Sequence, residues 1–125
     1  MKVSLIAILT MVLLFSSCER IDLGREIEVK PGETYKISWN LSFKVDSIND
    51  YRCPIGAACI WAGDVDLYFD FGSTEEVLNL NNQDTNPFAI KGYLIEILDV
   101  DPYPSLEPYP GDIPEIIIYL RVEKE

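Results

Sequence analysis

Alternation of apolar and polar side chains with a period of two residues is the dominant pattern of this chain. Because successive side chains of a strand point to opposite faces, such alternation predicts a strand with one buried face. The longest example runs from residue 35 to 45, where the odd positions are Tyr35, Ile37, Trp39, Leu41, Phe43 and Val45. This run is long enough to bend near Asn40 into two strands.

Five further segments carry strand patterns. Ile27 and Val29 precede the turn Pro31-Gly32, and the remaining segments are residues 64–71, 77–80, 93–98 and 116–122. No window has the i, i+3, i+4, i+7 stripe of an amphipathic helix. Short strands with one apolar face, separated by turns, predict an all-β fold with a single antiparallel β-sandwich. An immunoglobulin-like or related Greek-key order is expected, and a small β-barrel is the alternative.

The first 17 residues have the layout of an export signal. Lys2 precedes an apolar run over residues 3–15, and the small residues Ser16 and Ser17 follow. The run is shorter than the roughly 20 residues that a membrane-spanning helix needs. A charged start, an apolar core and a small-residue end are typical of a secretory signal peptide, here residues 1–17.

Cys18 follows this segment directly. Phe15-Ser16-Ser17-Cys18 resembles the lipobox of bacterial lipoproteins, although Phe15 stands where leucine is usual. In that motif the cysteine thiol receives a diacylglycerol and becomes the first residue of the mature protein. The resemblance implies lipid attachment at Cys18. Residues 18–25 would then be the tether to the membrane, and residues 26–125 the β-sandwich domain. An ordinary signal peptide that ends in a chance cysteine is the alternative.

The other two cysteines are Cys53 and Cys59. Two cysteines in an exported protein most simply form one disulfide, and Pro54 and Gly56 favour the turn between them. A redox pair is the alternative, but five intervening residues do not match the Cys-X-X-Cys spacing. A zinc site is a weaker alternative, because the chain offers two thiols here and no histidine.

Composition excludes several classes of function. The chain has 125 residues, 21 acidic and 10 basic side chains, no histidine and a formal net charge of −11. This charge argues against nucleic acid as a partner, because phosphate binding needs a basic surface. Without histidine there is no Ser-His-Asp triad and no Cys-His pair. We expect neither a metal nor another cofactor.

Residues 52–63, Arg-Cys-Pro-Ile-Gly-Ala-Ala-Cys-Ile-Trp-Ala-Gly, form the most distinctive stretch of the chain. The stretch resembles a motif of small uncharacterised lipoproteins of Gram-negative bacteria, in which Asp-Ser-Arg-Cys-Pro leads to Cys-Ile-Trp-Ala-Gly. Tyr51 stands where that motif has serine. The resemblance extends to the Pro31-Gly32-Glu33 turn, to Pro-Tyr-Pro at 102–104 and to a last strand with Tyr119. It implies a lipid anchor, a disulfide, an all-β domain and an outer-membrane location, and it implies no activity.

The residues of this motif also have a structural interpretation. Arg52 can donate to loop carbonyls or to an acidic neighbour such as Asp50. Trp61 is expected to fill the core beside the disulfide, with its indole N–H bonded to a carbonyl. Gly63 permits a bend where the next strand begins, and Pro54 starts the turn between the cysteines. The alternative is that the same residues form a binding site.

Acidic pairs and a proline-rich loop are the remaining candidates. Asp64/Asp66 and Asp99/Asp101 could offer oxygen ligands to Ca²⁺, but a solvated strand face explains them equally. A glycosidase would need two carboxylates across a cleft, which a small sandwich seldom provides. Between residues 101 and 112 Pro-Tyr-Pro occurs twice, centred on Tyr103 and Tyr109. This segment is a candidate recognition loop for a protein or a glycan, or else an ordered crossover between strands.

These observations favour a lipid-anchored protein of the cell envelope with a non-catalytic binding or structural role. Its partners would be the membrane, through the anchor, and a protein or glycan. One alternative is an inhibitor of a hydrolase of the protease or lysozyme type, which would present a rigid exposed loop to a cleft. Another is a glycan-binding accessory module, which would expose a flat ring of Trp39 or of a loop tyrosine.

Overall fold

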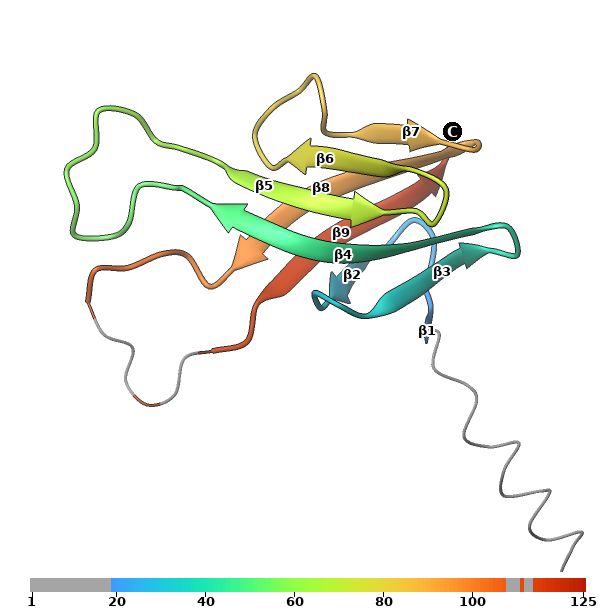
Figure 1. Ribbon diagram of the computed structural model, residues 1–125, viewed down its shortest axis with the longest axis horizontal. Helices are drawn as coiled ribbons and strands as arrows, with labels where there is room; N and C mark the ends of the chain where they lie inside the picture. Colours follow the sequence, from blue (N-terminus) through green and yellow to red (C-terminus); the bar gives the residue numbers. More distant parts are fainter. Residues whose placement is uncertain (1–18, 108–110, 112–113) are drawn as a thin grey trace, which may run out of the picture.

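The computed structural model describes residues 19–107, 111 and 114–125. This part of the chain contains nine strands and no helix, and the strands form two sheets that pack face to face (Figure 1). The expected β-sandwich is therefore confirmed, and the two sheets do not close into a barrel. The signal segment 1–17, Cys18 and Tyr109 lie outside the described residues.

The first sheet has the strand order β1-β3-β4-β5-β6. Strands β3 to β6 form an antiparallel meander, and the two-residue strand β1 pairs in parallel with β3. The bounds of these strands are Glu19–Arg20, Thr34–Ser38, Leu41–Asp50, Val65–Asp70 and Glu75–Asn79.

The second sheet is antiparallel and has the order β2-β9-β8-β7. Strands β7, β8 and β9 follow one another along the chain, whereas β2 arrives from the N-terminal part and pairs with β9. The four strands, in chain order, are Glu26–Val29, Phe88–Ile90, Tyr93–Asp101 and Ile117–Lys124.

The alternating apolar side chains meet between the sheets. Phe43 and Phe69 lie at the centre and are almost fully buried, with their ring centroids 5.6 Å apart. A row of ring contacts continues to both sides and joins the first sheet to β7 of the second; its members are Tyr35, Phe43, Phe69, Phe71 and Phe88. Burial of these rings removes a large apolar area from water, which is the main favourable contribution to folding.

The long alternating segment forms two strands. Trp39 and Asn40 make the turn between β3 and β4, and a register shift between Lys36 and Ser38 precedes it. Trp39 therefore lies outside the apolar face that its position in the alternation suggested, and its side chain is 87% exposed. Strands β1 and β7 have no counterpart among the predicted strands, because two or three residues are too few to show a period.

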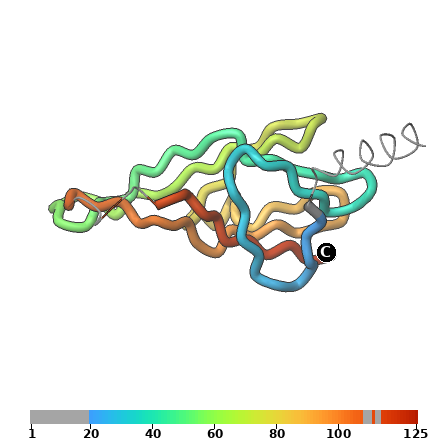
Figure 2. The backbone as a smooth tube through the Cα atoms, turned by 90° about the horizontal axis from the view of Figure 1, so that it is seen from below, coloured from blue at the N-terminus to red at the C-terminus, as the bar shows by residue number. Residues whose placement is uncertain are grey.

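The two ends of the sandwich differ. The long connections after β4 and after β8 meet at one end, while β1, the β3–β4 turn and the C-terminus lie at the other (Figures 1 and 2). The backbone after β1 stays against the domain, since the Ile21 N–H donates to the Lys36 carbonyl and the Gly24 N–H to the Val122 carbonyl. Among the described residues there is no helix of the length and apolar character needed to cross a membrane.

Candidate functional site

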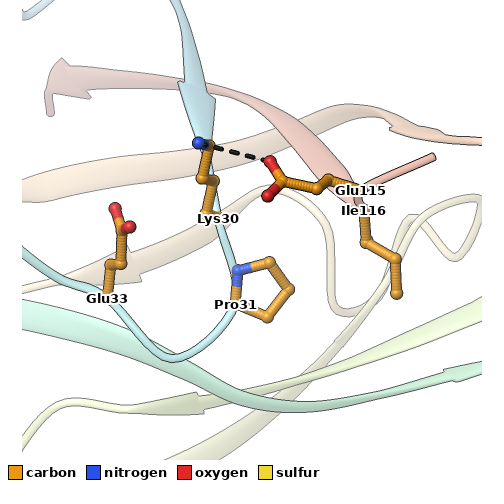
Figure 3. A pocket seen from close by; sticks show the side chains of 5 residues that line it. All are labelled: Lys30, Pro31, Glu33, Glu115 and Ile116. Carbon is orange, nitrogen blue, oxygen red and sulfur yellow. Dashed lines mark ion pairs between the residues drawn. The ribbon is translucent and has the colours of Figure 1, made fainter.

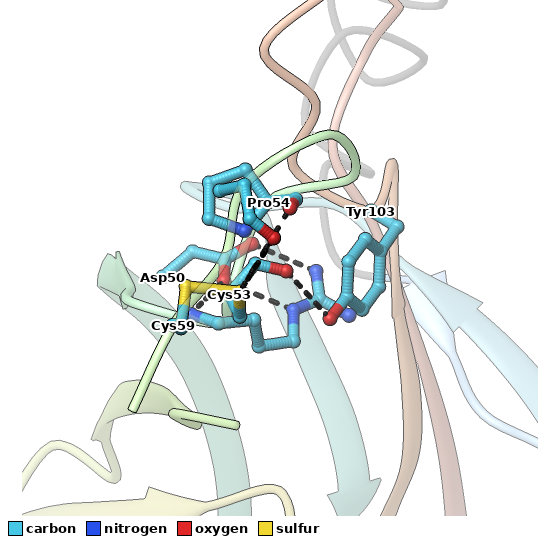
Figure 4. The surroundings of a disulfide bond; sticks show 7 residues. Asp50, Cys53, Pro54, Cys59 and Tyr103 are labelled. Atoms are coloured by element: carbon cyan, nitrogen blue, oxygen red, sulfur yellow. Dashed lines mark hydrogen bonds and ion pairs between the residues drawn. A yellow bond between two sulfur atoms is a disulfide. The ribbon is translucent and has the colours of Figure 1, made fainter. Parts of the chain in front are cut away.

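Two long connections form one unit at the end of the sandwich, which we call the loop pair: residues 51–64 and 102–107. The Ile55 N–H donates to the Pro104 carbonyl at 3.0 Å, and the Leu106 N–H donates to the Ile55 carbonyl at 3.1 Å. Ile55 and Ser105 thereby form an isolated parallel bridge. The Tyr103 hydroxyl adds a hydrogen bond to the Cys53 carbonyl at 2.9 Å (Figure 4). The two segments, far apart in sequence, are thus bound to each other.

The first loop is closed by a disulfide between Cys53 and Cys59, as predicted (Figure 4). Their Cα atoms are 5.9 Å apart, and the Pro54 carbonyl accepts the Ala57 N–H at 3.1 Å within the turn. Below the disulfide the two arms of the loop extend the β4–β5 pairing. The Tyr51 N–H donates to the Asp64 carbonyl, and the Cys53 N–H donates to the Ala62 carbonyl. The loop is therefore held along most of its length.

Arg52 connects the two segments of the loop pair through its side chain. The residue is 6% exposed, which makes it the one buried charged residue among residues 19–107, 111 and 114–125. Its Nε and Nη2 donate to the two carboxylate oxygens of Asp50 at 2.9 and 2.7 Å. Nη2 also donates to the Pro102 carbonyl at 3.3 Å, and the guanidinium lies 4.6 Å from the ring centroid of Tyr103. Both partners suggested by the sequence, a loop carbonyl and Asp50, are present.

The hydrogen bond to Asp50 raises the pKa of Arg52 above its usual value, and this effect outweighs the opposing effect of burial. A guanidinium in this position stays charged at every pH at which the protein is folded. The bidentate pair with Asp50 offsets the cost of burying that charge.

Gly63 closes the base of the first loop. Its φ is +71°, and a Cβ added there would lie 2.0 Å from the carbonyl oxygen of Tyr51. Both conditions exclude other residues, because L-residues rarely adopt this φ and no atom can approach so closely. The expectation that Gly63 permits a bend before β5 agrees with this geometry.

The prediction that Trp61 fills the core was wrong. Its side chain is 69% exposed and contacts the ring of Tyr51, with a centroid distance of 5.8 Å. The loop that carries Trp61 projects past the ends of the strands, where no second sheet lies opposite to cover it (Figures 1 and 2). Phe43 and Phe69 occupy the centre of the core instead.

Large apolar side chains are exposed on the loop pair. Ile55 is 60% exposed and Leu106 is 65% exposed on the two segments that the Ile55–Ser105 bridge joins, and Ile60 is fully exposed after the disulfide. Single exposed apolar residues are common on protein surfaces, but several on one rigid projection indicate a contact surface. We call Ile55, Ile60 and Leu106 the apolar tip.

A second surface lies beside the apolar tip, and we call it the aromatic face: Tyr51, Trp61, Asp66 and Tyr68. The Tyr51 hydroxyl donates to Oδ1 of Asp66 at 3.2 Å, and the Asn79 amide donates to the same oxygen. The pKa of Tyr51 is raised above its usual value. Desolvation is the largest cause, and this hydrogen bond and the charges of Asp66 and Asp64 add to it. Tyr51 is 38% exposed and Tyr68 is 39% exposed.

The structure gives the acidic pairs different surroundings. Asp64 accepts from the Val65 N–H, from the backbone N–H of Asn81 and from the side-chain amide of Asn81, so it holds a turn in place. Asp99 accepts the Val100 N–H and lies 4.0 Å from a nitrogen of Arg52. These contacts assign structural roles to both residues.

One acidic cluster was not anticipated. Ligand atoms of Asp46, Asp70 and Glu75 lie within 4.8 Å of one another on three neighbouring strands. Asp46 already pairs with Lys44 at 3.2 Å, and Asp70 accepts the Gly72 N–H. Asp46 is far from the other two in sequence, so no local pattern signals its proximity to them. Two of the three carboxylates, those of Asp46 and Asp70, thus already have partners.

An open pocket of about 360 Å³ lies where the β2–β3 turn meets the start of β9 (Figure 3). Lys30 and Glu115 form an ion pair across it at 3.4 Å, with Pro31, Glu33 and Ile116 around them. The side chains of Lys30 and Glu115 are 51% and 76% exposed. A solvated ion pair of this kind contributes little to binding or stability.

Comparison with known proteins gives no relative from which a role could be transferred. The chain matches no protein-family model, no curated protein and no solved structure.

Proposed function

We propose that this protein is a non-catalytic binding protein of the bacterial cell envelope, attached through Cys18 to the outer membrane of a Gram-negative cell. Its binding surface is the apolar tip, and its partner is another protein. The observation that carries the proposal is the exposure of Ile55 and Leu106 on two loops that backbone hydrogen bonds join.

Rigidity supports a role in recognition. The disulfide, the Ile55–Ser105 bridge and the Arg52–Asp50 pair hold the loops in one arrangement before any partner arrives. A preorganised surface loses little conformational entropy on binding, so apolar contacts convert more fully into affinity. A loop that only connects two strands can be polar throughout. Exposed isoleucine and leucine side chains are not needed for such a connection, so they support a role in binding.

The position of the tip supports the same conclusion. The described chain begins with β1 at one end of the sandwich, and the loop pair forms the other end (Figures 1 and 2). A lipid on Cys18, the residue before β1, would leave the tip directed away from the membrane. The tip would then be accessible to other proteins.

Site-specific photo-crosslinking in native cells tests the proposed surface. A photoreactive amino acid is placed at Ile55 or Leu106, and Trp39, which is 87% exposed at the opposite end, is the matched control position. We expect both tip positions to give the same protein adduct and the control position to give none. Equal labelling from all three positions, or no adduct from the tip, would contradict the proposal.

Intact-mass analysis of the protein from its native membrane tests the anchor. The expected mass is that of a chain that starts at Cys18 and carries acyl groups. A chain that retains residues 1–17 would overturn the lipoprotein assignment.

Inhibition of a hydrolase is a second candidate for the same surface. The turn Pro54–Ala58 is closed by the disulfide between Cys53 and Cys59 (Figure 4). A rigid turn of this kind can enter an enzyme cleft with little loss of conformational entropy. Proteases and lysozyme-type enzymes assayed with the purified domain would show inhibition that Ile55→Asp abolishes, and no inhibition would exclude this candidate.

A further inference from the structure

The aromatic face has the chemistry of a cation site. Trp61 and Tyr51 present rings beside Asp66, with Tyr68 on the same strand as Asp66. A cation is attracted by the negative face of an aromatic ring, most strongly by that of tryptophan. Both hydrogen bonds to Asp66 reach Oδ1, and no donor from the described part of the chain reaches Oδ2. That oxygen can accept from a ligand.

The charge around this face favours a positive ligand. Arg52 is the only basic residue between Val45 and Ile90, and residues 92–120 contain none. Arg52 itself is buried and paired with Asp50. Every other charged side chain of these two segments is therefore acidic, and no exposed cation of theirs competes for Asp66. Such a surface repels anionic lipids and phosphates and attracts a basic protein.

The protein already contains one contact of the kind that such a site would make with its ligand. On the inner side of the loop pair the Arg52 guanidinium stacks on the Tyr103 ring and pairs with the Asp50 carboxylate. On the outer side Tyr51, Trp61 and Asp66 supply the rings and the carboxylate, without a guanidinium. A planar guanidinium suits this combination better than an ammonium group, because it can stack on a ring and hydrogen-bond in its plane at the same time.

We propose that the aromatic face binds an arginine side chain of the protein partner. The inference rests on the proposed function, because the arginine belongs to the protein that contacts the apolar tip. Tyr51 and Trp61 would cover the guanidinium, and Oδ2 of Asp66 would accept one of its N–H groups. Arginine, tyrosine and tryptophan are the residues that most often dominate the energy of protein interfaces, which agrees with this pairing.

The test titrates the purified domain with N-acetyl-arginine amide and, separately, with N-acetyl-citrulline amide, which is close in shape but uncharged. The readout is the NMR signal of the Trp61 indole N–H, assigned with a Trp39→Phe variant. We expect arginine amide to shift the Trp61 signal and leave the Trp39 signal unchanged, with citrulline amide weaker by on the order of tenfold. Added salt should weaken the response.

Two variants make the test specific. Asp66→Asn keeps an oxygen that can accept from Tyr51 and Asn79, and it should reduce the affinity for arginine amide about fivefold. Asp84→Asn, which removes an exposed carboxylate from another loop, should leave the affinity unchanged. Trp61→Leu replaces an exposed ring and should abolish the response, as followed by the backbone amide signals of Asp66 and Tyr68.

Three results would overturn the inference. The first is an equal shift with arginine amide and citrulline amide. The second is an equal effect of Asp66→Asn and Asp84→Asn on the affinity for arginine amide. The third is a response of the Trp61 signal to a neutral oligosaccharide such as chitotriose in place of arginine amide. The last result would assign the face to glycans. If crosslinks from Ile55 and Leu106 persist in any of these cases, the proposed function stands and only the arginine site fails. If the crosslinks are absent as well, both fail.

Discussion

The guanidinium of Arg52 lies 4.6 Å from the centre of the Tyr103 ring, and this contact ties together two loops that leave different sheets. The same guanidinium pairs with Asp50 at the end of β4. This buried charge is thus one of the contacts that hold the loop pair on the sandwich. The stability of the loops and the geometry of the apolar tip depend on it.

Replacement of Arg52 should destabilise the fold strongly. Removal of one partner from a buried ion pair leaves the other uncompensated, so Arg52→Ala should lower the free energy of unfolding by about 3 kcal/mol. Arg52→Lys should restore little of this, because an ammonium group cannot form the bidentate contact or stack on Tyr103. Urea denaturation measures both.

Arg121 provides the matched control for Arg52. Its side chain is 40% exposed and lies 3.7 Å from Glu96, so Arg121→Ala should cost less than about 1 kcal/mol. Similar losses for Arg52→Ala and Arg121→Ala would show that the pair with Asp50 contributes no more than a surface contact.

Loss of the disulfide should lower stability to a moderate degree. On the chain-entropy model, a loop as short as that between Cys53 and Cys59 contributes about 2 kcal/mol. The double variant Cys53→Ser, Cys59→Ser should therefore unfold at lower urea concentration. The wild-type protein treated with reductant should unfold at the same midpoint as this variant. A large difference between the two would indicate that the serines disturb the loop in some other way.

Gly63 should tolerate no side chain. In Gly63→Ala the new Cβ meets the Tyr51 carbonyl oxygen at a distance that requires the backbone to move, and we expect a loss of about 3 kcal/mol or more. Gly24 has a similar φ of +76° with no atom within 4 Å of the added Cβ. In Gly24→Ala only the unfavourable backbone conformation should matter, and the free energy of unfolding should fall by about 1 kcal/mol. Thermal unfolding of both variants compares the two effects, and equal losses would contradict the close approach.

Tyr51 should lose its proton at higher pH than an ordinary tyrosine. Its surroundings raise its pKa in the folded protein, so the neutral form is favoured by folding. The resulting stability is fully present below the unfolded-state pKa of about 10 and is lost as the pH rises through the folded-state value. Ultraviolet titration of tyrosinate should show a late component that Tyr51→Phe removes.

Asp66→Asn provides a further check of the same titration. It removes the charge of Asp66, so the Tyr51 component should move to lower pH. Tyr119 also has a raised pKa, caused first by desolvation and then by Asp101, and its component should not move. An unchanged Tyr51 component in Asp66→Asn would contradict the contact between the two side chains.

Much of the fold could be predicted because alternation is a local property of the chain. The inner-face positions of β4, β5, β8 and β9 are apolar, and their neighbours on the other face are mostly polar. The sequence of each strand therefore indicates which of its faces is buried. The Cys53–Cys59 disulfide was predictable for a similar reason, since its partners are close in sequence. Arg52 and Asp50 lie within the same short segment, and their contact could be anticipated as well.

The sites depend on relationships that no local pattern contains. Trp61 is apolar and stands in a distinctive motif, but its burial depends on whether a second sheet lies opposite, and beyond the ends of the strands there is none. Asp66 meets Tyr51 and Asn79 only because β5 pairs with β4 on one side and with β6 on the other. Ile55 meets Ser105 and Leu106 across the gap between two connections.

The sequence alone therefore determined the longer strands, most of their buried faces and the disulfide, because each follows from the chemistry of neighbouring residues. The tertiary structure decided which side chains face solvent together. The apolar tip and the aromatic face each combine residues from segments that only strand pairing and loop contacts bring side by side. Those contacts were selected by the free energy of the whole packed molecule, which no single segment encodes.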